Sequence, residues 1–271
     1  MKQLVRWGAI LGLVGSSLLG PSLATHMSAI ALPESEVLKR METVPLFAVT
    51  NQEGLPILAS VPNPQDKTKK VQIATFFVSQ QDAQTLVTNL KTNKPDVGKV
   101  AKVAPVSLRQ AYELVRKNQT NKENLVFQFL PAQQQVDSAL AVLKQNGQQV
   151  KEFNGIPLFY AIGGQDKGLL TIEQGKNKII PFYFSQKDLQ GMLDQLKQQK
   201  SPLSSTAKIQ VTTLDQVVNS LLKENGAAIS EITFVPSREA INYVMQQQQS
   251  APNSKTTPQP AKAAPNTPTK K

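Results

Sequence analysis

The chain has 271 residues, 40% of them hydrophobic, and a formal net charge of +11. This length suits one large or two ordinary domains with a sizeable core. There is no cysteine and a single histidine, His26, which lies in a segment that we expect to be removed. Disulfides, thiolate nucleophiles, iron–sulfur clusters, a Ser-His-Asp triad and a histidine metal cage are therefore excluded. We predict that the protein is not an enzyme and has no catalytic residue, metal site or cofactor.

Residues 1–31 have the pattern of a secretory signal peptide. Lys2 and Arg6 form a positive start, residues 7–19 form an uncharged apolar run, and Ala29-Ile30-Ala31 supplies a small-residue cleavage site. A second candidate site is Ser22-Leu23-Ala24. The apolar run is shorter than the roughly 20 residues of a membrane span, which argues against an uncleaved anchor. We expect cleavage after Ala31 and export to the periplasm.

The last residues, 249–271, form a low-complexity tail of Pro, Ala, Thr, Asn and Lys. Such a segment buries too little apolar surface to offset its ordering entropy, so we predict a disordered tail. The leader and the tail hold six of the 30 basic residues, so residues 32–248 keep 24 against 19 acidic residues, a net charge of +5. This charge fits plain solubility, and it also fits attraction to an anionic membrane surface. Nucleic acid is not expected as a partner.

In chain order, we expect an N-terminal helix over residues 32–43 and then two similar halves, 44–149 and 155–248. Ser79–Lys91 and Ser185–Lys197 are identical at six of 13 positions. Two shorter motifs also recur, Val44-Pro45-Leu46-Phe47 as Ile156-Pro157-Leu158-Phe159 and Phe129-Leu130-Pro131 as Phe234-Val235-Pro236. Three repeats in one order predict an internal duplication.

Each half is predicted to begin with a hairpin and to continue with three strand–helix pairs. The hairpins surround turns at residues 51–54 and 163–168, where glycines permit a tight reversal. The paired strands are expected at residues 71–78, 100–104 and 125–130, and at residues 178–184, 207–212 and 230–235. Helix N-caps are expected at Ser79, Ser107, Ser185 and Thr213, Pro131 and Pro236 in first helical turns, and Gly147 and Gly226 at helix ends. The fold class is therefore α/β, with amphipathic helices on mixed sheets.

Two polar motifs have both a chemical and a structural interpretation. Gly163-Gly164 with Gly168 is compatible with a phosphate loop, but these glycines lie in a hairpin and lack the Lys-Ser/Thr pair of such a loop. Asp82 and Asp188 recur at one position and would form a catalytic pair only if they converged. Each lies three residues after a Ser cap, which favours a capping role.

The positive signal for function is aromatic. Strand aromatics place large apolar groups on both faces of each predicted sheet. If helices cover only one face, the other is an exposed apolar groove, and we expect Phe47, Phe159, Phe77 and Tyr183 to line it as substrate-binding residues. The alternative is a sheet covered on both faces, which is usual for parallel sheets.

The signal peptide, the repeated Val/Ile-Pro-Leu-Phe motif, the junction at residues 76–83 and the Phe-Leu-Pro junction at residues 129–131 resemble the twenty-two-kilodalton Tic family. The resemblance covers roughly residues 34–248. That family comprises soluble components of chloroplast protein import and their cyanobacterial relatives. The resemblance implies a pseudo-twofold, two-lobed α/β body with apolar pockets, located in the periplasm and also compatible with the thylakoid lumen.

It further implies a chaperone-like role toward unfolded outer-membrane protein precursors, near the POTRA domains of the barrel-assembly pore. We therefore expect an ATP-independent chaperone or translocation factor that supports outer-membrane biogenesis. The alternative is a non-catalytic structural adaptor of the barrel-assembly or import machinery. Suppression of aggregation of an unfolded barrel protein separates the two roles.

Overall fold

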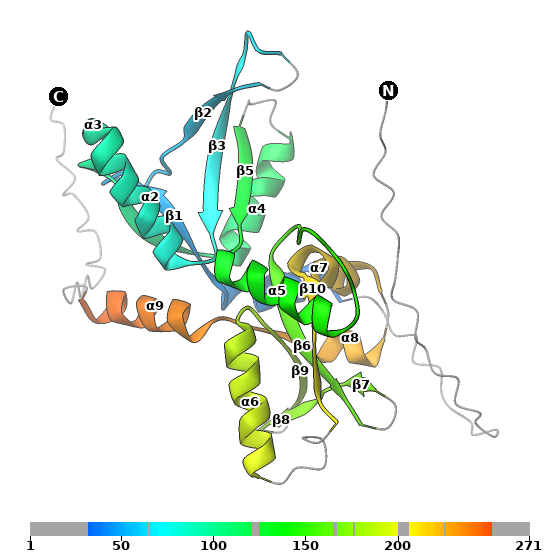
Figure 1. The fold of residues 1–271 in the computed structure, drawn as a ribbon. Helices are drawn as coiled ribbons and strands as arrows, with labels where there is room; N and C mark the ends of the chain where they lie inside the picture. The colour runs from blue at the N-terminus through cyan, green and yellow to red at the C-terminus, as the bar shows by residue number, and fades with distance from the viewer. Residues whose placement is uncertain are drawn as a thin grey trace, which may run out of the picture.

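The computed structural model describes residues 32–63, 66–120, 125–164, 167–175, 177–199, 206–224 and 226–250. The chain folds into a mixed α/β body with two sheets (Figure 1). The predicted signal peptide and most of the predicted tail lie outside the described residues. Within these ranges, no helix combines the length and the apolarity that crossing a membrane requires.

The first sheet has the strand order β4-β1-β3-β5. β1 runs antiparallel to β3 and β4, whereas β3 and β5 are parallel. β2 pairs antiparallel with the part of β3 that extends beyond β1. The strands are β1 (Pro45–Thr50), β2 (Ala59–Pro62), β3 (Lys70–Phe77), β4 (Lys102–Ser107) and β5 (Leu125–Leu130).

The second sheet has the order β10-β6-β9-β11, with β9 and β11 parallel and the other main pairs antiparallel. Order and directions thus match those of the first sheet. An internal duplication predicts this agreement, and the duplication itself stays a prediction. The strands are β6 (Pro157–Gly163), β7 (Gly168–Leu169), β8 (Ile172–Gln174), β9 (Asn177–Tyr183), β10 (Lys208–Thr213) and β11 (Ile232–Val235).

The described helices begin where their caps predict. Ser79 and Ser185 each accept a hydrogen bond from the backbone N–H three residues later, at 3.2 Å. Ser107 and Thr213 form reciprocal capping pairs with glutamines three residues on. The helices are α1 (Glu34–Glu42), α2 (Gln80–Asn93), α3 (Pro95–Gly98), α4 (Leu108–Thr120), α5 (Gln133–Gln145), α6 (Gln186–Gln198), α7 (Leu214–Lys223), α8 (Ala227–Glu231) and α9 (Arg238–Ser250).

Four local expectations need correction. Pro131 and Pro236 precede the residues that cap α5 and α9, so they lie just outside the first helical turn. Gly226 precedes α8, whereas Gly147, at φ +81°, ends α5 as predicted. Because glutamine is a good helix former, α9 continues to Ser250, and the tail boundary predicted at residue 249 falls inside the helix.

The hairpin predicted in the first half is much reduced. Thr50 and Pro56 form a single bridge, and the Asn51 side chain closes the turn by accepting from the N–H of Leu55 at 2.9 Å. The chain then leaves β1, because the longer strand β3 offers an unpaired segment to β2. In the second half the predicted hairpin forms between β6 and β7.

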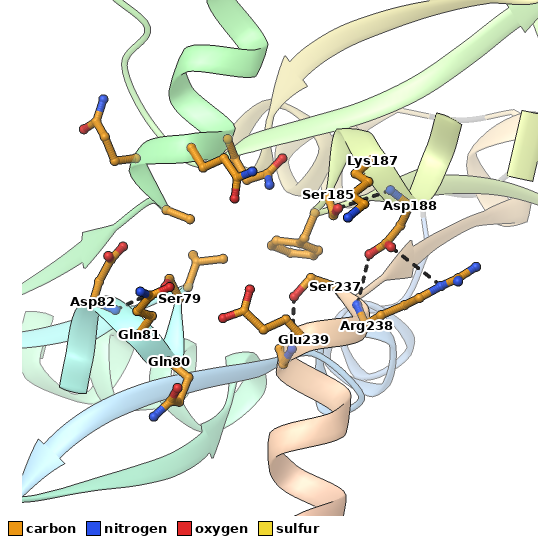
Figure 2. Close-up of a pocket in the computed structure, with 17 residues that line it drawn as sticks. Ser79, Gln80, Gln81, Asp82, Ser185, Lys187, Asp188, Ser237, Arg238 and Glu239 are labelled. Carbon is orange, nitrogen blue, oxygen red and sulfur yellow. Dashed lines mark hydrogen bonds and ion pairs between the residues drawn. The ribbon is translucent and has the colours of Figure 1, made fainter. Parts of the chain in front are cut away.

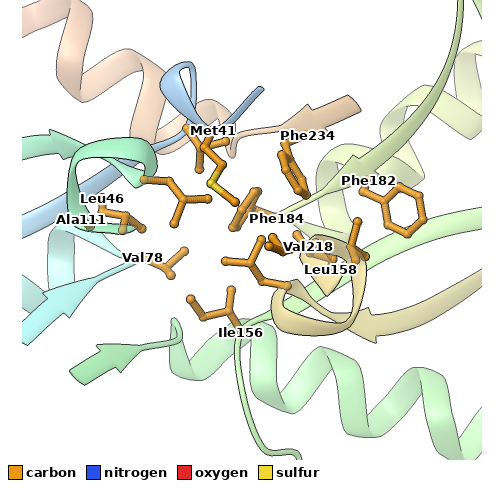
Figure 3. Packing of buried hydrophobic residues seen from close by; sticks show 14 of the residues in the cluster. Met41, Leu46, Val78, Ala111, Ile156, Leu158, Phe182, Phe184, Val218 and Phe234 are labelled. Atoms are coloured by element: carbon orange, nitrogen blue, oxygen red, sulfur yellow. The ribbon is translucent and has the colours of Figure 1, made fainter. Parts of the chain in front are cut away.

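Helices cover the centre of each sheet on both faces. α2 and α9 pack on one face of the first sheet, around Phe47 and Ala240. α5 and α6 pack on the corresponding face of the second, around Phe159 and Ala139. The last helix of each half therefore packs on the sheet of the other half. The opposite faces meet in a shared central core with α1, α4 and α7, where Met41, Leu46, Leu158, Phe184 and Phe234 pack together (Figure 3).

Candidate functional site

The structure brings the four predicted binding aromatics together as two cross-strand pairs. Phe47 lies opposite Phe77 in the first sheet, and Phe159 lies opposite Tyr183 in the second. Their exposed fractions are only 0%, 6%, 0% and 8%. Tyr243 of α9 packs edge-to-face on Phe47, with ring centroids 5.4 Å apart.

This burial corrects the expected open groove at these residues. The groove required a sheet face without helices, but α9 covers Phe47 and α5 contributes to the core around Phe159. The residue spacing did not reveal the cover, because α5 and α9 each come from the other half of the chain. Whether any of the four contacts a client stays a prediction.

The open apolar surface lies farther along the same face of the first sheet. Val61 pairs with Val71, and Ile73 pairs with Val126, so these side chains share the face of Phe77. Val126 is 48% exposed, and the other three are half-buried. We call these four residues the distal face. They lie in the part of the sheet that extends away from the body in Figure 1.

A polar cavity of about 430 Å³ lies where four helices begin. The N-terminal ends of α2, α5, α6 and α9 line it (Figure 2). Each helix follows the carboxyl end of a strand, and these strands are the two parallel pairs β3–β5 and β9–β11. Parallel strands end at the same edge, so their helices start together. The capping signals predicted the individual helix starts. That the four starts meet at one cavity follows only from the packing of the two sheets, which the sequence did not show.

Among the carboxylates of this cavity, Asp188 makes the contacts that join two helices. Asp188 accepts a hydrogen bond from the backbone N–H of Arg238 at 3.0 Å, and its carboxylate lies 3.6 Å from the Arg238 Nε. The side chain of Gln135 accepts from the N–H of Gln186 at 3.0 Å. Asp188 therefore joins α6 to the start of α9, beyond the capping role predicted for it. Burial raises the pKa of the neighbouring Tyr183 phenol, and the Asp188 carboxylate raises it further, whereas Arg238 lowers it.

The cavity has a structural role at the helix starts. Its acids oppose the positive ends of the helix dipoles, which stabilises helix starts. No group of three or more metal-ligating side chains occurs within the described ranges. Gly163 is the last residue of β6 and pairs with Gly168, and Gly164 lies in the turn that follows, with φ +78°, so the turn interpretation of that motif is confirmed.

The chain matches the Tic22-like family over residues 14–248. It is 24% identical over 220 residues to Protein TIC 22, chloroplastic, of Pisum sativum, covering 81% of this chain and 79% of that protein. The protein of the same name from Arabidopsis thaliana is 26% identical over 216 residues, covering 79% and 72%.

Two solved structures have the same fold. Anabaena Tic22, described as a protein transport protein, superposes with a TM-score of 0.70 at 29% identity, covering 79% of this chain and 97% of that one. Tic22 from Plasmodium falciparum superposes with a TM-score of 0.62 at 19% identity, covering 80% and 99%.

Proposed function

Because the chain belongs to the Tic22-like family, whose members are protein-transport factors, we propose that it is an ATP-independent periplasmic chaperone or translocation factor. Its clients are unfolded outer-membrane protein precursors. The likeness to a structure described as a protein transport protein supports the general role. The client class and the compartment are the parts that we add.

The observation that carries this proposal is the distal face. Val126 is 48% exposed, and Leu55 and Leu58, in the loop before β2, are 61% and 40% exposed. A chaperone that works without ATP needs apolar surface in its resting state, because no energy-driven step uncovers it. The four distal-face residues are neighbours on the sheet, and contiguous apolar surface of this kind is typical of interaction sites.

Strands of outer-membrane barrels alternate apolar and polar side chains. A flat apolar sheet face contacts one side of such a segment and leaves the polar side in water. Contact of this kind is weak and reversible, which suits transfer to the POTRA domains of the assembly pore. The net charge of +5 over residues 32–248 favours an approach to an anionic membrane surface.

The test is aggregation of a urea-unfolded barrel protein on dilution, followed by light scattering in the presence of the mature chain. We expect suppression by the wild type and weaker suppression by Val126→Ser. Val150→Ser is the matched control, because Val150 is also 48% exposed and lies outside the distal face. Unchanged aggregation at molar excess of wild type would exclude the chaperone and favour the structural adaptor of the barrel-assembly machinery.

We also propose that the two halves arose by internal duplication. The support is the equal order and direction of β4-β1-β3-β5 and β10-β6-β9-β11. Superposition of these strands in the order given, with α2 on α6 and α4 on α7, tests it. A fit that requires a different order of strands would contradict the duplication.

A further inference from the structure

The main strand paths of the two sheets end in the edge strands β4, β5, β10 and β11, and within the described ranges other groups cover part of each edge. β4 contains Pro105, which has no N–H to offer to an added strand. Asn146 donates to the carbonyl of Ile209 in β10 at 3.2 Å. The Arg40 guanidinium donates to the carbonyl of Ile232 in β11 and to that of Ser230 just before it. Prolines, charges and covering groups of this kind keep edge strands from pairing with other chains.

The fourth edge, β5, is open along its centre. Its sequence, Leu-Val-Phe-Gln-Phe-Leu, contains no charge and no proline. The carbonyl of Leu130 accepts from Val78, which follows β3, so alternate residues of β5 turn toward β3 and the others turn outward. Phe127 and Phe129 turn their backbone N–H and C=O groups outward, and within the described ranges no hydrogen bond reaches these groups. Asn118 covers only the beginning of the edge, at the carbonyl of Leu125.

The side chains beside this edge define what fits. A strand laid along β5 continues the sheet, so its alternate side chains extend the distal face next to Val126. Apolar residues are favoured there, because Val126 remains 48% exposed. The described part of the sheet end beyond Leu125 is basic, because Lys67, Lys69 and Lys70 are all exposed and, within the described ranges, Lys69 alone of the three forms an ion pair, with Asp66.

We infer that the edge of β5 takes up an extended segment of unfolded polypeptide as an added strand. The segment has alternating apolar side chains and an acidic residue at the end that lies beside Lys70. This inference rests on the proposed function and names the way in which the client is held. Backbone hydrogen bonds supply affinity without a sequence requirement, and the alternating side chains supply selection.

The experiment titrates the full mature chain with a fluorescent 12-residue peptide that alternates valine and threonine and ends in two glutamates. Val126→Lys places a charge on the edge strand and is expected to weaken binding at least about tenfold. Val126→Thr keeps the β-branched shape and is expected to bind within about twofold. Leu169→Lys adds the same charge at an exposed position of the second sheet and is expected to bind like the wild type.

Two control peptides test separately the strand conformation and the terminal charge of the bound segment. A peptide with a central proline removes the strand conformation, and one ending in two lysines reverses the charge; both are expected to bind more weakly. Amide hydrogen exchange supplies the location, because the peptide is expected to protect Phe127 and Phe129. Equal binding by Val126→Lys, or unchanged exchange at these two amides, overturns the inference.

Protection of the same amides that rises with protein concentration alone assigns the edge to a second copy of this chain and overturns the inference. The variants are also compared in the aggregation assay. If wild type and Val126→Lys suppress aggregation equally, the edge of β5 is not used and the inference is overturned; the chaperone role then stands, but without the distal face as its binding surface. If the wild type fails to suppress aggregation, the proposed function is wrong, and the peptide titration still decides the edge.

Discussion

The two sheets have the same strand order but different ends. In the second sheet, Leu170 is 3% exposed and its N–H donates to the carbonyl of Ala161 at 2.8 Å, so the chain after β7 covers the end of the sheet. Arg40 also donates to the carbonyl at the start of β11. In the first sheet, Val126 is exposed and the centre of the β5 edge is open. Equal topology therefore does not give equal surfaces, because the groups that cover the edges and ends differ between the two sheets.

The largest expected effect tests whether the two buried aromatic pairs are equivalent. Phe47→Ala and Phe159→Ala each remove a side chain with 0% exposure, and each should lower the free energy of unfolding by about 3–5 kcal/mol. Urea denaturation measures this loss. Leu55→Ala, at a residue that is 61% exposed, should change it by less than about 0.5 kcal/mol. Wild-type midpoints for both phenylalanine variants would restore the open groove that the sequence suggested.

Much of the local structure was predictable because its signals are local. The strand predicted at residues 125–130 matches β5 residue for residue. Ser79 and Ser185 cap helices as expected, since a cap acts within one turn. The cover of each sheet was not predictable. The direction that α5 takes after Pro131, or α9 after Pro236, depends on packing against residues far away in the chain.

The candidate site was likewise predictable only in part. The sequence predicted an open face at Phe47 and Phe77, and strand alternation places Ile73 and Val71 on the same side as Phe77. That face is covered at Phe47 and Phe77, whereas Val126 is exposed; whether it binds a client stays a prediction. Arg40 carried no recognisable signal, because its carbonyl partners lie about 190 positions away.

The second prediction removes the side chain that donates to the carbonyls at the start of β11. Arg40→Met keeps an unbranched apolar stem but loses charge-assisted hydrogen bonds to the carbonyls before and within β11. We expect a loss of about 2–3 kcal/mol in the free energy of unfolding. Arg116→Met is the matched control, because the ion pair of Arg116 with Glu34 is exposed and should contribute less than about 1 kcal/mol. Similar losses in the two variants would show that the Arg40 contacts have no special weight.

The third prediction compares the two repeated aspartates. Asp188→Ala removes the acceptor for the Arg238 N–H and the ion pair that joins α6 to α9, so it should cost about 1–2 kcal/mol. Asp82→Ala removes a favourable charge at the start of α2 and should cost about 0.5 kcal/mol. Thermal unfolding of both variants at equal concentration measures the difference. A larger effect at Asp82 would contradict the assignment of Asp188 as the link between the helices.

The smallest expected effect uses the tyrosines that only the second sheet carries at its centre. Phe77 in the first sheet occupies the place of Tyr183 in the second, and each lies opposite a buried phenylalanine. Burial raises the pKa of the Tyr183 and Tyr160 phenols above the ordinary value of 10.0.

The raised pKa fixes the direction in which stability changes with pH. The folded state holds the phenol protons more tightly than the unfolded state, so the associated stability is fully present below the ordinary value and is lost as pH rises through the raised value. Wild type should therefore lose more of its urea midpoint between about pH 9 and pH 11 than a Tyr160→Phe, Tyr183→Phe double variant. Absorbance of tyrosinate measures the titration directly. Equal losses of midpoint, together with two phenols that titrate at their ordinary value, would show that water reaches the second sheet where the structure buries these rings.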